Sequence, residues 1–228
     1  MKRLIQITML TQKPLFLILF IIIATSIAAI GGALIGLDQQ ILSIWNSEDH
    51  VIEVLSALLY FIAAGFAALC FARTKEKIYA LSTGAFLFAF AREMDWHKAF
   101  TSDSFLKSRF YSSDEIPLNE KIFGASVILC MLCVFIPLLL KIPRLISDFF
   151  KLQPTAWFLS GGLGFIAFAK MLDALGRLFP VLVDFKHDND TALGFLEESL
   201  ELLGAVLIAS AIIIQCAKIY RNRAERGA

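Results

Sequence analysis

Six long apolar stretches, separated by polar connections, dominate this sequence of 228 residues. A transmembrane helix needs about 20 mostly apolar residues to cross roughly 30 Å of hydrocarbon. The stretches that reach this length are 14–37, 51–72, 78–97, 122–140, 156–179 and 192–216. Each must be helical, because an open strand would leave backbone hydrogen-bonding groups unpaired in lipid. The sequence therefore predicts an all-α, polytopic membrane protein: a bundle of six transmembrane helices forming a single integral membrane domain over residues 1–228.

The composition excludes an ordinary soluble domain. Hydrophobic residues make up 58% of the chain, charged residues only 18%, and the mean hydropathy is +0.72. A soluble domain of this length needs a more polar surface. We therefore expect membrane lipids as the surroundings and partners of the chain, and no nucleic acid.

The basic residues are distributed unevenly between the two sides of the predicted bundle. Thirteen of the 21 lie before the first span, between spans two and three, between spans four and five, or after the sixth, with only three acidic residues beside them. The positive-inside rule then places both termini in the cytoplasm. The other acidic residues fall toward the opposite face, so we expect a cell-membrane protein, of a bacterial inner membrane, with a periplasmic or extracellular active face.

Polar side chains enter the second and third spans from this outer face. His50, Glu53 and Tyr60 fall on one side of the second helix at helical spacing. The third span ends with Arg92, Glu93 and, one turn later, His97. On one continuous helix Glu93 and His97 would point toward one centre, a spacing that suits metal ligation or acid–base chemistry.

The fifth and sixth spans carry a second group of ionisable residues. Lys170, Asp173 and Arg177 share one face, and a span ending at residue 179 would place Lys170 inside the hydrocarbon. Near the start of the sixth span, Glu198 and Glu201 lie within one turn of each other and would repel without a cation, a proton or a basic partner.

The first and fourth spans carry few polar groups, so we expect them to form a lipid-facing scaffold around a polar cavity built by the other four. We assign a role to each polar group predicted at this cavity. The candidate catalytic residues are Glu53, Glu93, Asp173 and Glu201; the candidate substrate-binding residues are Arg92, Lys170, Arg177 and Tyr60; and the candidate metal ligands are His50, His97, Glu198 and His187.

Three functions fit this arrangement, and the sequence leaves open whether the protein is an enzyme. A metal-dependent hydrolase or transferase could use a divalent ion of the zinc or iron/manganese class to activate water, while the cations bind a lipid or lipid-linked headgroup. An ion or proton-coupled transporter or channel also places ionisable residues in the membrane, although the inner half of each span is nearly free of charge. A non-catalytic assembly or binding subunit would use the same charges only to organise its helices.

Overall fold

The computed structural model describes residues 51–174 and 190–227, and their regular secondary structure is entirely α-helical. Four helical segments in these ranges are long and apolar enough to cross a membrane: Ile52–Thr74, Leu118–Phe150, Pro154–Asp173 and Leu193–Arg223. The prediction of an all-α, multi-pass membrane protein is therefore confirmed. The predicted first span, 14–37, lies outside the described residues, so the number of spans and the orientation stay predictions.

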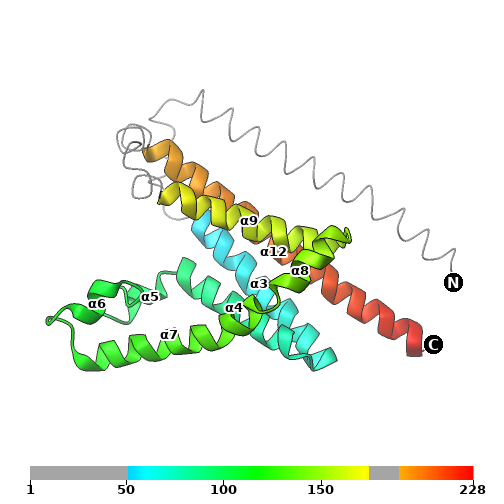
Figure 1. The fold of residues 1–228 in the computed structure, drawn as a ribbon, viewed down its shortest axis with the longest axis horizontal. Coiled ribbons are helices and arrows are strands. Elements are labelled where there is room, and N and C mark those ends of the chain that lie inside the picture. The colour runs from blue at the N-terminus through cyan, green and yellow to red at the C-terminus, as the bar shows by residue number, and fades with distance from the viewer. Residues whose placement is uncertain (1–50, 175–189, 228) are drawn as a thin grey trace. The chain divides into compact units, whose positions relative to one another are not determined.

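Helices α3 (Val51–Thr74) and α4 (Lys77–Glu93) pack along each other as a hairpin (Figure 1). The turn between them passes through Lys75 in the left-handed region, with φ of 60°. α3 can approach its neighbours closely because small residues fill its buried face. These buried small residues are Ser56, Ala57, Ala63, Ala64, Ala67 and Cys70.

The third predicted span, 78–97, is wrong in its last turn. α4 ends at Glu93, and Asp95 then adopts φ of 53° before the short helix α5 (Trp96–Ala99) begins. A left-handed residue stops an α-helix, because its backbone cannot continue the right-handed hydrogen-bond ladder. Glu93 and His97 therefore do not lie on one continuous helix.

The segment from α5 to the start of α7 (Leu118–Leu139) contains a short helix and buried side chains and is not an open loop. We call this segment, residues 96–117, the cap. It contains the short helix α6 (Ser108–Ser112) and buries Phe105 and Phe110. These rings lie against Gly124 of α7, where an added Cβ would be 2.7 Å from the Cβ of Phe105.

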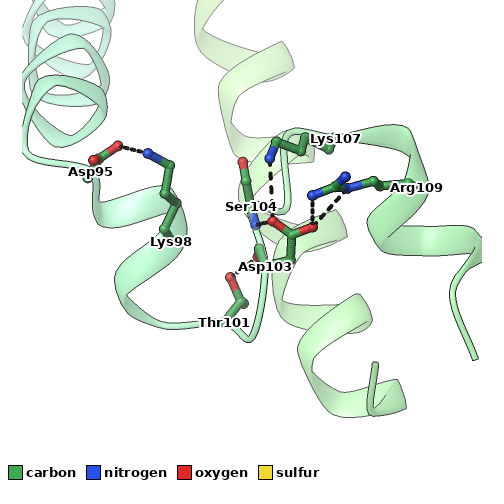
Figure 2. A network of polar contacts seen from close by, with 7 residues as sticks. All are labelled: Asp95, Lys98, Thr101, Asp103, Ser104, Lys107 and Arg109. Atoms are coloured by element: carbon green, nitrogen blue, oxygen red, sulfur yellow. Dashed lines mark hydrogen bonds and ion pairs between the residues drawn. The ribbon is translucent and has the colours of Figure 1, made fainter. Parts of the chain in front are cut away.

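Asp103 is the centre of a polar network that holds the cap together (Figure 2). Its carboxylate accepts hydrogen bonds from the backbone N–H of Ser104 at 2.7 Å and from Nε of Arg109 at 3.0 Å. Lys107 adds a longer ion pair at 3.5 Å. The Ser104 hydrogen bond, followed by that from Arg109, lowers the pKa of Asp103. The network thus depends on an ionised carboxylate.

The second half of the described chain consists of α7, α8 (Ile142–Phe150), α9 (Pro154–Asp173) and α12 (Asp190–Gly227). α7 is largely exposed, and the lipid-facing position expected for the fourth span stays a prediction. α9 ends at Asp173, short of the predicted 179. α12 has 38 residues, or about 57 Å at 1.5 Å per residue, and therefore extends beyond the hydrocarbon.

The chain divides into two compact units. Among the described residues, one unit contains 166–174 with 190–203, and the other contains 51–165 with 204–227. In the larger unit, Gly162 of α9 lies against α12, where an added Cβ would be 2.7 Å from Cγ1 of Ile208. The prediction of one integral domain over 1–228 includes residues outside these ranges and stays a prediction.

Candidate functional site

The smaller unit holds an ion cluster between α9 and α12. Lys170 lies in the last turn of α9, and its ammonium is 2.9 Å from Oε1 of Glu197 and 2.5 Å from Oε1 of Glu201. The two glutamates are one turn apart on α12, so both carboxylates reach the same ammonium. We call Lys170, Glu197 and Glu201 the Lys170 cluster.

The members of the Lys170 cluster differ in exposure. The side chain of Lys170 is 42% exposed, whereas those of Glu197 and Glu201 are 19% and 11% exposed. A carboxylate withdrawn from solvent needs a charged or hydrogen-bonding partner, because desolvation penalises its ionised form. Lys170 supplies that partner to both glutamates, while its own side chain stays partly exposed.

This geometry changes what can be expected of Lys170. The sequence alone made Lys170 a candidate to bind a phosphate or carboxylate of the substrate. In the structure, two carboxylates of the protein already contact its ammonium, so an anion must compete with them. The position also differs, because α9 ends three residues after Lys170 instead of continuing to 179. Lys170 is therefore one turn from the end of its helix.

Asp173 and Glu198 lie near the Lys170 cluster in sequence and are partly buried. Asp173 is the last residue of α9, and Glu198 directly follows Glu197 on α12. Each makes interactions of its own. Their predicted roles in catalysis and metal binding stay predictions.

The polar side chains predicted to share one face of α3 point toward the protein interior. Glu53 is partly buried, Ser56 is 1% exposed and Tyr60 is 6% exposed. The three residues are spaced by three and four positions, which places them on one helix face. The predicted common face of Glu53 and Tyr60 is thus confirmed, whereas their chemical roles stay predictions.

Ser56 lies between Glu53 and Tyr60 on this face of α3. Its hydroxyl is buried, and within the described parts of the chain it has no hydrogen-bond partner. A buried unsatisfied hydroxyl costs about 1–3 kcal/mol. The spacing from Glu53 and Tyr60 places Ser56 on this face, but no sequence pattern shows that its hydroxyl has no hydrogen-bond partner among residues 51–174 and 190–227.

At the end of α4, Arg92 and Glu93 form an ion pair with an N–O distance of 3.0 Å. The Glu93 side chain is only 7% exposed, and the Arg92 side chain is 41% exposed. Asp95, beyond the helix end, pairs instead with Lys98 at 2.8 Å (Figure 2). Arg92 therefore accompanies a nearly buried carboxylate, and its predicted role in substrate binding stays a prediction.

Three of the predicted metal ligands fall where the structure gives no side-chain position. His50 and His187 lie outside the described residues, as does the candidate substrate-binding Arg177, and only the backbone of His97 is described. Within 51–174 and 190–227, no three His, Cys, Asp or Glu side chains are placed to hold a metal ion. The metal centre stays a prediction, but the helical spacing used to join Glu93 to His97 is wrong.

Comparisons with protein families, with characterised proteins and with solved structures give no match in any of the three cases. Any function must therefore be argued from the residues and the geometry of this chain.

Proposed function

We propose that this protein is a membrane-embedded hydrolase or transferase acting on a lipid or lipid-linked headgroup. The observation that supports this proposal is the Lys170 cluster, in which one reachable ammonium contacts two largely buried carboxylates. Carboxylates held in this way can accept a proton from an attacking hydroxyl or water, and an ammonium can orient a polar headgroup. A substrate entering from the bilayer can keep its acyl chains in lipid while its headgroup reaches the cluster.

The cluster also has a depth that suits such a substrate. The charge-free run 202–217 of α12 covers about 24 Å at 1.5 Å per residue, somewhat less than the hydrocarbon thickness. Glu201 directly precedes this run, so the cluster belongs near the boundary between hydrocarbon and headgroups. We place this boundary on the periplasmic or extracellular side of a bacterial inner membrane, in a six-span chain with both termini cytoplasmic.

A divalent metal is part of the proposal only if the histidines supply ligands. Glu197 and Glu201 already contact Lys170, so the described residues alone do not provide an open metal site. With His50, His97 or His187 added, a zinc or iron/manganese-class ion would activate water for attack. Elemental analysis of the purified protein and of the Glu198→Gln variant tests this directly. A stoichiometric metal in the wild-type protein that is lost in the variant supports the centre, and a metal-free active protein contradicts it.

The enzymatic proposal is tested by reconstituting the full-length protein in liposomes with a panel of phospholipids and lipid-linked sugars. Headgroup release or transfer is followed by mass spectrometry. Glu201→Gln should abolish turnover while the protein stays folded, whereas Glu225→Gln, at an exposed glutamate near the other end of α12, should leave turnover unchanged. Equal turnover in the two variants would contradict a role for the cluster.

Proton or ion coupling is the second candidate, and the same contacts favour it. An ammonium that donates a hydrogen bond to Glu197 and forms an ion pair with Glu201 can pass a proton between the two carboxylates with small movements. Proteoliposomes containing a pH-sensitive dye distinguish this function. A proton flux that Glu201→Gln removes, in the absence of lipid turnover, would support coupling in place of headgroup chemistry.

A further inference from the structure

We propose that α8 lies in the plane of the membrane surface and binds anionic phospholipid headgroups. The apolar segment Leu118–Phe150 is interrupted by a turn at Leu140 and Lys141, so α8 is a separate helix at its end. α7 before it and α9 after it, with 22 and 20 residues, are each long enough to span. The nine residues of α8 cover about 14 Å, too short to cross hydrocarbon. A short helix between two spanning segments must lie where the chain leaves the membrane.

The two faces of α8 differ sharply in chemistry. Ile142, Ile146 and Phe150 follow one another at intervals of four and are 41%, 49% and 77% exposed. Leu145 and Phe149 flank this row on the helix surface. The other face contains Arg144, Ser147 and Asp148, with Lys151 directly after the helix. Such a helix places its apolar row at the acyl boundary and its polar face among headgroups.

The corner after α8 fixes the helix relative to α9. Leu152 adopts φ of 55°, while its N–H donates to the carbonyl of Phe149 and that of Gln153 to the carbonyl of Asp148, at 3.0 and 3.1 Å. This pair of bonds closes a helix with a left-handed residue. Trp157 of α9 stacks on Phe149 with ring centroids 4.3 Å apart. Tryptophan favours the membrane interface, so this corner belongs at headgroup level.

Charge complementarity identifies the lipid class. Lys141, Arg144 and Lys151 surround α8, with Asp148 as the acidic residue of the helix. The Lys151 ammonium lies 3.9 Å from the carboxylate of Asp148. Three basic residues against one acidic residue leave this segment with an excess of positive charge. Basic groups at an interfacial helix attract anionic headgroups, and each contributes to the preference over zwitterionic lipid.

The first experiment places the two faces of α8 relative to the bilayer. Cysteines are introduced one at a time at Ile146, Phe150, Arg144 and Ser147 in a full-length protein whose native cysteines are replaced by alanine. In phosphatidylcholine liposomes, a water-soluble maleimide should label Ile146→Cys and Phe150→Cys several-fold more slowly than Arg144→Cys and Ser147→Cys. Equal labelling on both faces would overturn the in-plane position.

The second experiment measures the lipid preference at Trp157, with Trp45 and Trp96 replaced by phenylalanine. Brominated phosphatidylcholine quenches Trp157, and added phosphatidylglycerol relieves the quenching in proportion to its relative affinity. Arg144→Gln should lower this relative affinity about fivefold. Asp148→Asn should raise it, because it removes the acidic group. A relative affinity that neither substitution changes would overturn the proposal.

Discussion

The Lys170 cluster predicts an unequal response to removal of its members. Lys170→Met leaves Glu197 and Glu201, one turn apart and largely buried, without the ammonium that contacts both. Glu201→Gln instead keeps the contact of 2.9 Å between Lys170 and Glu197, and its neutral amide oxygen can still accept a hydrogen bond. The lysine substitution should therefore destabilise the protein more than the glutamine substitution.

The exposure of the ion pairs sets the scale of the two effects. Breaking a fully buried ion pair costs about 3–5 kcal/mol, whereas an exposed pair contributes about 0–1 kcal/mol. Because the Lys170 side chain is 42% exposed, we expect an intermediate loss for Lys170→Met, on the order of 2 kcal/mol. For Glu201→Gln we expect a loss of about 1 kcal/mol, typical of weakening one hydrogen bond.

The double variant Lys170→Met/Glu201→Gln makes the test specific. It removes the ammonium and one of the two carboxylates that repel each other, so it should be more stable than Lys170→Met alone. The free energy of unfolding is measured by equilibrium denaturation in detergent micelles, followed by helical circular dichroism. If Glu201→Gln costs as much as Lys170→Met, or if the two effects simply add, the cluster is not a shared ion network.

Three further predictions follow from single side chains. Ser56→Ala should leave the free energy of unfolding unchanged or raise it, because it removes a buried hydroxyl without a described partner. A loss of turnover in this stable variant would assign the hydroxyl to function. A clear destabilisation would contradict the buried geometry. Gly162→Ala should destabilise the protein by about 1–3 kcal/mol through overpacking. Gly164→Ala should leave the stability unchanged, because no atom lies within 4 Å of its new Cβ. The melting temperatures of the two variants test this difference. The low pKa of Asp103 makes its stabilisation of the cap complete above about pH 4 and lost as the pH falls through the folded-state pKa. Proteolysis of the cap should therefore accelerate in acid, and by a smaller factor in Asp103→Asn, which keeps the Glu120 carboxylate bound to Ser102.

The apolar spans could be predicted because hydrocarbon imposes a strict rule. Backbone groups in lipid must be paired internally, so a long apolar run has to be a helix. The common face of Glu53 and Tyr60 followed for a similar reason, since the helical period alone fixes it. These features depend on positions close together in the chain.

The residues at which helices end, and the side chains that pair between helices, could not be predicted in this way. α4 stops at Glu93 because Asp95 takes a left-handed conformation, a choice that the hydrophobic pattern does not reveal. The sequence indicated that Glu201 needs a cation, a proton or a basic partner, but it could not show that Glu197 and Glu201 share the ammonium of Lys170. That contact depends on the register between α9 and α12, which apolar helix faces leave undetermined.

The Lys170 contacts could serve structure, function or both. Substitution of a carboxylate in the cluster distinguishes these roles. If the cluster only joins α9 to α12, replacing Glu201 by glutamine should affect activity no more than its small effect on stability implies. If the carboxylate transfers protons, the same substitution should abolish turnover or flux while the protein stays folded, because an amide cannot accept and release a proton at neutral pH. Lys170→Met cannot make this distinction, since it removes the cation from both glutamates and lowers stability as well. Glu201 is therefore the residue at which a functional role and a purely structural role predict different outcomes.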